Sequence, residues 1–168
     1  MNTNETRQTI HAQIVVLLPR LRRFARNLTR NVHDADDIVQ IALERALSRL
    51  DQWRSDARLD SWLFKIVRNA WIDELRSRGR RDKMFLAEEE GENVGSDTMQ
   101  AETAMESVRS AIARLPEDQR IAVSLVLVEE LPYKEAAEVL DIPIGTLTSR
   151  LARGREALQA MLGPEGGR

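Results

Sequence analysis

The sequence predicts an all-α fold of two small helical domains joined by a flexible acidic linker. First, apolar residues recur at a spacing near 3.6 in almost every segment outside residues 82–105, as in amphipathic helices. Second, the strand-like run IAVSLVLV (121–128) has no second strand to pair with, which favours a helix there as well. Third, residues 82–105 are rich in Glu, contain Gly, Ser and Asn, and have few large apolar residues, which is typical of a linker.

Charge divides the chain into the same three parts. Residues 1–81 carry 16 Lys and Arg against 10 Asp and Glu, residues 82–105 carry 1 against 7, and residues 106–168 carry 8 against 10. The net charge of -2 and the pI of about 5.8 therefore conceal a basic first domain, an acidic linker and a nearly balanced second domain. A low overall pI argues against nucleic-acid binding, but this uneven distribution removes that argument.

Composition excludes several classes of protein. No apolar run approaches the roughly 18 residues that a membrane helix needs, so we expect no membrane contact by the chain itself and a cytoplasmic location. The absence of cysteine excludes disulfides and thiolate chemistry, and two histidines are too few for a histidine-rich zinc site. There is no general-base constellation and no phosphate-cradling glycine loop, so we expect no enzyme activity, no catalytic residue, no cofactor and no metal.

In the first domain, three helices are expected. The first should kink or start afresh at Pro19. The second should begin near Asp34, where Asp34 and Asp37 resemble a capping box. Residues 51–60 have the character of a polar loop, and the third helix should end in the basic run 76–81, with Gly79 as its C-cap. The expected inward residues are Ile14, Leu17, Leu18, Leu21, Ala25, Leu28, Ile38, Val39, Ala42, Leu43, Ala46, Leu50, Trp62, Leu63, Ile66, Val67, Ala70 and Leu75.

In the second domain, a stripe of Val108, Ala111, Ile112 and Leu115 should end at Pro116, which occupies the first position of the next helix. Pro132 then starts a short helix over 133–140, DIPIG forms a tight turn, and a longer helix covers 146–162. This is the layout of a helix-turn-helix. Ala136, Ala137 and Leu140 should pack on Leu147 and Leu151, and the exposed side chains of the second helix should be Thr146, Thr148, Ser149, Arg150, Arg153 and Arg155.

The exposed hydroxyls and arginines of that second helix suit major-groove edges and phosphates. An ordinary helical hairpin with a solvated arginine face would show the same pattern, so the motif alone leaves both interpretations open.

Two patterns in the first domain also carry chemistry. The residues Asp36, Asp37, Gln40 and Glu44 follow one side of a helix, which suits helix capping with a solvated stripe, docking of a basic partner helix or, least of all, a divalent metal. The segment 53–81 interleaves all three tryptophans with arginines, as single-stranded DNA binding requires, although the tryptophans could instead be core residues. Trp71 lies half a turn off the face of Trp62 and should be less deeply buried.

Four motifs, in this order, resemble the extracytoplasmic-function (ECF) group of bacterial sigma factors: DADDIVQ (34–40), ARLDSWLFKIVRNAWIDELR (57–76), LPEDQR (115–120) and YKEAAEVLDIPIGTLTSRLARGREAL (133–158). The resemblance covers about residues 12–81 and 106–162. It implies a transcription initiation factor with region 2 at 1–81, a linker at 82–105 and region 4 at 106–168. Region 2 would bind the β′ coiled coil of core RNA polymerase and melt the -10 promoter element. Region 4 would bind the -35 element and the β flap, and an anti-sigma factor would be a further partner.

Residue by residue, the resemblance assigns polymerase binding to Asp36, Asp37, Gln40 and Glu44. It assigns binding of the -10 DNA to a second set, in which the 53–61 loop would hold a flipped base. These residues are Trp53, Arg54, Ser55, Asp56, Arg58, Lys65, Arg68, Asn69, Asp73 and Arg76. It assigns the -35 DNA to Thr146, Thr148, Ser149, Arg150, Arg153 and Arg155. Three positions depart from the family pattern, because Leu59 replaces phenylalanine, Thr148 replaces lysine and Pro132 replaces a serine N-cap.

The sequence also allows two other classes of function. A stand-alone helix-turn-helix regulator would bind a palindromic site as a dimer, but it leaves the acidic face and the tryptophan-arginine segment unexplained. A helical module that sequesters a partner would show no DNA affinity at low salt.

Overall fold

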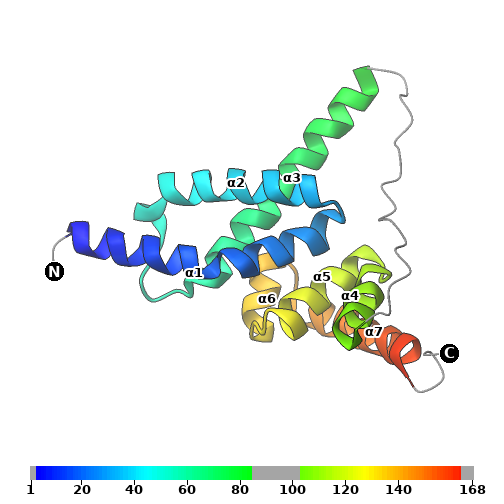
Figure 1. Cartoon of the computed structure of the whole chain (residues 1–168). Helices are drawn as coiled ribbons and strands as arrows, with labels where there is room; N and C mark the ends of the chain where they lie inside the picture. The colour runs from blue at the N-terminus through cyan, green and yellow to red at the C-terminus, as the bar shows by residue number, and fades with distance from the viewer. Residues whose placement is uncertain (1–2, 85–102, 164–168) are drawn as a thin grey trace.

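The computed structural model describes residues 3–84 and 103–163, and every regular element in these ranges is helical. The predicted all-α fold is confirmed. Figure 1 shows one bundle of three helices and a second bundle beside it. The elements in order are α1 (Thr3–Thr29), α2 (Val32–Ser48), η1 (Leu50–Gln52), α3 (Leu59–Met84), α4 (Ala104–Ala113), α5 (Glu117–Val123), η2 (Ser124–Val128), α6 (Tyr133–Leu140) and α7 (Ile144–Leu162). Most of the predicted linker, 85–102, lies outside the described residues.

The first bundle packs α1, α2 and α3 against one another around two aromatic rings. Phe24 of α1 and Phe64 of α3 are fully buried, with ring centroids 5.1 Å apart in an edge-to-face arrangement. Such pairs add to the free energy that burial alone supplies. The predicted apolar stripe of α1 is buried around them, with Leu17 and Leu18 only partly covered.

The starts of two helices differ from the prediction. At Pro19 a kink or a fresh start was predicted, and the fresh start is wrong, because α1 runs through Pro19 as one helix. Ile14 and Leu21, on either side of Pro19, are buried. Proline has no N–H, so the backbone carbonyl one turn earlier loses its hydrogen-bond donor. Because Pro19 lies on the exposed side of the helix, water can bond that carbonyl instead. The capping box at Asp34 is also wrong. Asn31 is the N-cap, and its side chain accepts a 3.0 Å hydrogen bond from the Asp34 backbone N–H, so α2 begins at Val32.

Helix α3 is longer than predicted, since it continues through Gly79 to Met84 instead of ending there. Arg78 and Arg81 both pair with Glu74, at 3.0 and 3.1 Å, and bonds along one helix face stabilise these last turns. Leu75, predicted to point inward, is 43% exposed.

The relative burial of two tryptophans was also predicted wrongly. Trp71 is 7% exposed, whereas Trp62 is half-buried. The prediction assumed one buried stripe, but α3 contacts α1, α2 and α6, so more than one of its faces is covered. The Arg78 guanidinium lies 5.3 Å from the centroid of the Trp71 ring and covers part of it.

The second bundle confirms the helical interpretation of IAVSLVLV. Residues 121–123 end α5, and the chain continues directly into the π-helical turn η2. Pro116 is the N-cap of α5 and not its first helical residue, and Val108 is 42% exposed instead of buried in the α4 stripe.

The predicted helix-turn-helix is present as α6, a turn at 141–143, and α7. Asp141, the C-cap of α6, adopts the left-handed conformation, and α7 begins at Ile144, two residues earlier than predicted. The two helices pack together, and the five residues predicted to form their contact are all buried: Ala136, Ala137, Leu140, Leu147 and Leu151.

The two bundles are in direct contact. Helix α6 packs on α3, and α5 and η2 pack on α1, so that the buried apolar residues of both bundles form one continuous cluster (Figure 1). The sequence predicted two domains on a tether and did not predict this contact.

Two glycines provide a test of the second bundle. A Cβ on buried Gly154 of α7 would lie 2.7 Å from Val123 Cγ2, whereas a Cβ on Gly79 would meet nothing within 4 Å. Because the β-branched Val123 is fully buried, we expect Gly154→Ala to destabilise the protein by about 1–3 kcal/mol despite its gain in helix propensity. Gly79→Ala should stabilise it by about 0.5–1 kcal/mol. Urea unfolding followed by circular dichroism measures the change in unfolding free energy for both variants. If Gly154→Ala stabilised the protein as much as Gly79→Ala, the close packing at Gly154 would be contradicted.

Candidate functional site

The four predicted docking residues of α2, Asp36, Asp37, Gln40 and Glu44, are all exposed. The last three line a groove between α2 and α3. Asp36 lies on the exposed surface outside that lining. Asp34 and Glu74 add two further carboxylates to the groove, and the half-buried Ile41 adds apolar surface. Carboxylates around an apolar strip complement a basic amphipathic helix.

One wall of this groove is held by Arg78. Its guanidinium donates to both carboxylate oxygens of Asp34, at 2.7 and 3.1 Å, and to Glu74 at 3.0 Å. The hydrogen bonds to Asp34 outweigh the effect of burial and, with those to Glu74, raise the pKa of Arg78 above its usual value. The start of α2 and the second half of α3 are thereby fixed to each other, which shapes the groove in advance of any partner.

The predicted -10 residues fall on two neighbouring surfaces. In the loop before α3, Arg54 and Asp56 form an exposed ion pair of 3.1 Å, and Ser55 is exposed. Trp53 is half-buried, and its Nε1 is buried without an acceptor among the described residues. On α3, Arg68 is half-buried and the other four residues share one exposed face at helical spacing: Lys65, Asn69, Asp73 and Arg76.

Besides Arg54 and Asp56, two more of these predicted residues have partners in the protein. Asp73 accepts a 2.7 Å hydrogen bond from Arg45 of α2. Arg58 donates to both carboxylate oxygens of Asp60, at 3.0 and 2.8 Å. Arg58 therefore anchors the loop before α3 to the first turn of that helix. The Asp60 carboxylate partly balances the positive charge of Arg58.

Asp60 also accepts from the Ser61 backbone N–H at 2.8 Å and from Arg20 at 3.1 Å. Burial raises the pKa of Asp60, but the hydrogen bonds from Arg58, Ser61 and Arg20 together outweigh burial and hold that pKa below its usual value.

This pKa predicts a pH dependence of stability. A carboxyl group whose pKa is lowered by folding stabilises the protein above its unfolded-state pKa of about 3.9, and that contribution disappears as the pH falls through the folded-state value. Asp60→Asn should therefore lower the free energy of unfolding at pH 7, and its difference from the native protein should shrink towards pH 3. Urea titrations across this range test it, with the exposed Asp51→Asn as control. A difference independent of pH would contradict the assignment.

The predicted -35 face lies on α7. Thr148, Ser149, Arg153 and Arg155 are exposed, whereas Thr146 and Arg150 are half-buried. Arg150 lies 3.8 Å from Asp118 of α5, and Arg153 donates to the Ser149 Oγ at 3.2 Å. The second helix of the motif thus presents hydroxyl and guanidinium groups near its N-terminus, where helix-turn-helix proteins contact base edges.

Known proteins match both halves of the chain. The Sigma-70 region 2 family matches residues 14–81, and the family Sigma-70, region 4 matches residues 105–158. The ECF RNA polymerase sigma factor EcfG of Rhodopseudomonas palustris is 35% identical over 94% of this chain and 87% of its own length. The chain belongs to the ECF sigma factors. SigW of Bacillus subtilis, another ECF sigma factor, is 33% identical over 79% of this chain and 77% of its own length.

A solved structure is similar in fold to this sigma factor over nearly its full length. The structure is that of the sigma factor RpoE in complex with the anti-sigma factor NepR from Bartonella quintana. It matches with a TM-score of 0.76 at 28% identity, and covers 94% of this chain and 99% of the matched chain. α1 to α3 are thus region 2, and α4 to α7 are region 4, of a transcription initiation factor. Among the described residues, no helix is long and apolar enough to cross a membrane.

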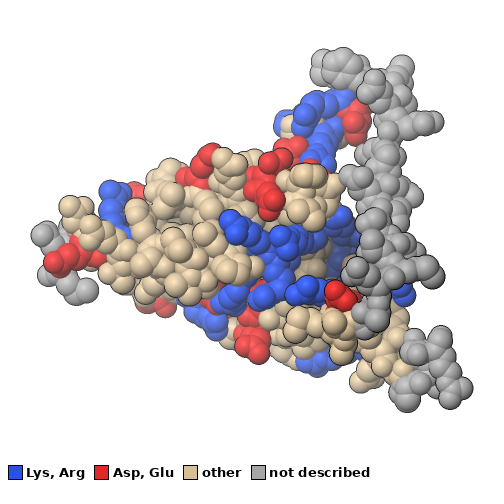
Figure 2. Space-filling model, viewed as in Figure 1, with Lys and Arg blue, Asp and Glu red and all other residues tan. Residues whose placement is uncertain are grey.

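Basic side chains mark the surface of this sigma factor unevenly. Figure 2 shows Lys and Arg gathered around the carboxyl-terminal half of α1 and at the projecting end of α3. On α1 these include the exposed Arg22, Arg26 and Arg30. The clustering agrees with the positive net charge of residues 1–81.

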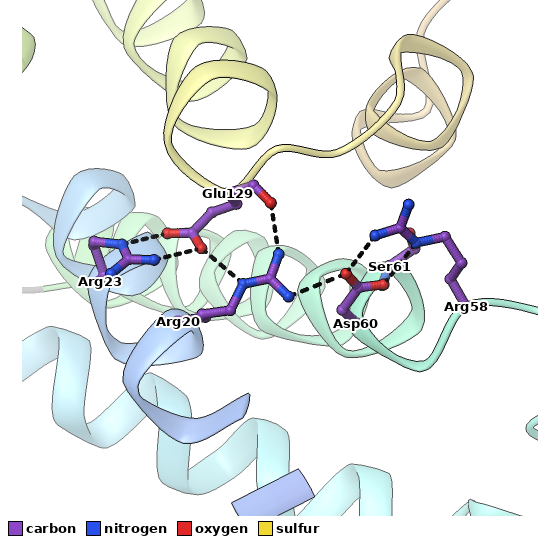
Figure 3. Close-up of polar contacts among 6 residues, drawn as sticks. All are labelled: Arg20, Arg23, Arg58, Asp60, Ser61 and Glu129. Carbon is purple, nitrogen blue, oxygen red and sulfur yellow. Dashed lines mark hydrogen bonds and ion pairs between the residues drawn. The ribbon is translucent and has the colours of Figure 1, made fainter. Parts of the chain in front are cut away.

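The sequence reasoning missed a polar cluster between regions 2 and 4 (Figure 3). Glu129 follows η2, and its side chain has no exposed surface. Its carboxylate accepts from Arg20 Nε at 3.1 Å, and from Arg23 Nε and Nη2 at 2.7 and 2.9 Å. These residues are more than 100 positions apart, and helical periodicity reports only local neighbours, so no sequence signal pairs them.

Proposed function

We propose that this sigma factor performs transcription initiation through three surfaces: the α2–α3 groove for core RNA polymerase, the 53–58 loop with the exposed face of α3 for the -10 element, and α7 for the -35 element. One observation carries the proposal. Each of these surfaces keeps most of its predicted polar residues exposed, while the apolar stripe of the same helix is buried. The division into region 2 at 1–81, linker at 82–105 and region 4 at 106–168 belongs to this proposal, supported by family matches at 14–81 and 105–158.

The groove is proposed to receive the β′ coiled coil. Asp37, Gln40 and Glu44 would hydrogen-bond basic side chains of the coiled coil, with the half-buried Ile41 in apolar contact. The β flap would bind region 4, so that polymerase holds both regions at once. Two tethered contacts make the second one effectively intramolecular, which raises the overall affinity.

At the -10 element, strand separation would be driven by binding, and no bond is cleaved. Lys65, Asn69 and Arg76 share the exposed face along which the non-template strand would lie. A base that leaves the stack would be received by the 53–58 loop, whose Trp53 offers an aromatic surface. Arg58 and Asp60 hold that loop in place.

An anti-sigma factor is the proposed inhibitor. The sigma factor RpoE of the matched structure is bound to one, and it is 28% identical to this chain. An inhibitor here would cover the surfaces that polymerase binds. The proposal does not require an enzyme activity, a cofactor or a metal.

Run-off transcription with purified core RNA polymerase tests the proposal. Promoters selected from a random DNA pool by the reconstituted holoenzyme should yield a transcript that depends on this chain. No transcript together with no binding to core polymerase would overturn it. A stand-alone regulator would instead bind palindromic DNA as a dimer, without polymerase. A mass measurement distinguishes such a dimer from the factor proposed here.

A further inference from the structure

The carboxyl-terminal half of α1 presents cations that no acid of the same segment can balance. The sequence has no Asp or Glu between Glu5 and Asp34. Arg22, Arg26 and Arg30 are exposed, and within the described residues none of them forms an ion pair. They belong to the basic surface that Figure 2 shows around this half of the helix. These three residues are called the α1 arginine stripe below.

The spacing of four residues aligns the stripe along one side of the helix. Each step advances about 6 Å along the helix axis and turns about 40° around it, so the three residues span roughly 12 Å. One strand of duplex DNA carries a phosphate for about every 3.4 Å of its axis, so this length corresponds to three or four phosphates. The guanidinium group suits them, because its planar fork can donate two parallel hydrogen bonds to one phosphate.

The last member of the stripe has an unusual backbone. Arg30 has a φ of 57°, in the left-handed region where glycine or asparagine is normally found after a helix. It also lies near a second cation, because burial lowers the pKa of Arg120 and the charge of Arg30 lowers that pKa further, against the opposing effect of Glu117. A bound anion would balance this charge, and strained backbone positions cluster at binding sites.

The dipole of α1 explains only part of the stripe. Cations in the last turn of a helix balance the negative end of its dipole. Arg26 lies in that turn and Arg30 directly follows it, so both are stabilised there. Arg22 lies one turn earlier, where the effect of the dipole has faded. The dipole therefore does not account for three aligned arginines.

The surroundings of the stripe favour duplex DNA over a protein or a single strand. Leu21, Phe24 and Leu28 are buried, and the exposed large apolar residues of α1, Val15 and Val16, lie in its first half. A protein interface normally has an apolar core, which this surface lacks. A single strand is held by bases that stack on aromatic side chains, but the phenylalanine of α1 is fully buried. Exposed arginines alone suit the phosphates of a duplex.

We propose that the α1 arginine stripe binds the sugar-phosphate backbone of duplex DNA, at the part of the promoter that adjoins the -10 element. Phosphate contacts add affinity and fix the position of a protein on DNA without reading its sequence. Helix α1 packs against α3, whose exposed face is proposed to hold the -10 strand, so the duplex beyond the melted segment would pass over α1. This placement rests on the proposed function, whereas the binding of duplex phosphates by the stripe does not.

The salt dependence of DNA binding by the free full-length protein tests the stripe. The probe is a labelled duplex of about 20 base pairs of arbitrary sequence, followed by fluorescence anisotropy between about 50 and 200 mM salt. Each phosphate contact contributes about 0.9 to the slope of log K against log salt concentration. The combined variant Arg22→Gln, Arg26→Gln and Arg30→Gln should therefore flatten that slope by about 2–3 units and weaken binding at low salt at least about tenfold.

The matched control makes the same change of net charge at three exposed arginines outside the stripe. It combines Arg7→Gln, Arg49→Gln and Arg109→Gln. The control should change the slope by less than about one unit, because these side chains lie on three different helix ends and form no aligned row. Equal losses in the two combined variants would show that total charge governs binding, and would overturn the proposal.

Two comparisons distinguish the duplex from other occupants of the stripe. Single-stranded DNA of the same length should lose less affinity than the duplex in the combined stripe variant. A larger loss on the single strand would place an unstacked strand on α1. Unchanged duplex binding together with lost capture of core RNA polymerase would make the stripe a protein interface. Either result would overturn the proposal.

Arg30→Gly separates a binding role of Arg30 from a structural one. Glycine accepts the left-handed backbone, so the midpoint of thermal unfolding should stay the same or rise by about 2–4 °C. The salt slope on the duplex should nevertheless flatten by about one unit. Weaker DNA binding with a lower midpoint would make Arg30 a structural residue and remove it from the stripe. These measurements use neither polymerase nor a promoter, so a failure of run-off transcription would not decide them.

Discussion

Asp37→Arg is expected to abolish promoter-dependent transcription while leaving the fold intact. Asp37 is exposed on α2, it lines the groove between α2 and α3, and no ion pair to it is described. Reversing its charge places a cation against the basic helix proposed to dock there, and like-charge contact costs several kcal/mol, or at least about 100-fold in affinity. Pull-down of core polymerase and run-off transcription should both fall by this factor.

The matched control is Asp51→Arg, which makes the same charge change at an exposed acid in η1, outside the groove lining. It should retain transcription to within about twofold, as surface substitutions usually do. Gln40→Ala, in the same groove, should give an intermediate loss because it removes a neutral hydrogen-bonding group without adding repulsion. If Asp37→Arg and Asp51→Arg behaved alike, net charge and not the groove would govern polymerase binding.

The sequence predicted those features that depend on local spacing. The helices, the helix-turn-helix and the exposed face of α2 follow from apolar residues three and four positions apart, and the structure confirms them. Helix ends were predicted less well because several polar residues compete to cap the same turn. Asn31 caps α2 in place of Asp34, and Gly79 lies inside α3 because Glu74 bonds arginines on both sides of it.

Features that depend on distant segments could not be predicted. Trp71 is more deeply buried than Trp62 because α3 is covered by α1, α2 and α6, and no pattern within α3 records how many neighbours it has. The resemblance assigns Arg58 to DNA, but Arg58 pairs with Asp60, two residues away. Asp60 also accepts from Arg20 of α1, and Arg20 pairs with Glu129 only when both regions are in place. Glu129, which accepts from Arg20 and Arg23 of α1, directly follows a run of apolar residues that looks purely structural.

Arg153→Ala is expected to relax the -35 sequence preference more than it weakens binding overall. Arg153 is exposed about two and a half turns into α7, and its guanidinium hydrogen-bonds Ser149, so it is held over the surface proposed to enter the major groove. An arginine bonded to a guanine edge contributes about 1–3 kcal/mol of discrimination at that base. Selection of DNA from a random pool by the holoenzyme should therefore lose its preference at one or two neighbouring -35 positions, with transcription from the native promoter about 5- to 100-fold lower.

The contrasting variant is Thr148→Lys. The Thr148 hydroxyl donates to the Ile144 backbone oxygen at 2.8 Å, so it serves its own helix, and its replacement adds a cation without removing a contact to DNA. A cation facing phosphate strengthens binding to all sequences and steepens the dependence of affinity on salt by about one unit. Arg153→Ala should change the base preference with little effect on the salt slope, and Thr148→Lys should do the reverse. Arg114→Ala, an exposed arginine at the end of α4, should do neither. A uniform loss across all sequences in Arg153→Ala would place Arg153 on phosphate and leave base recognition to its neighbours on α7.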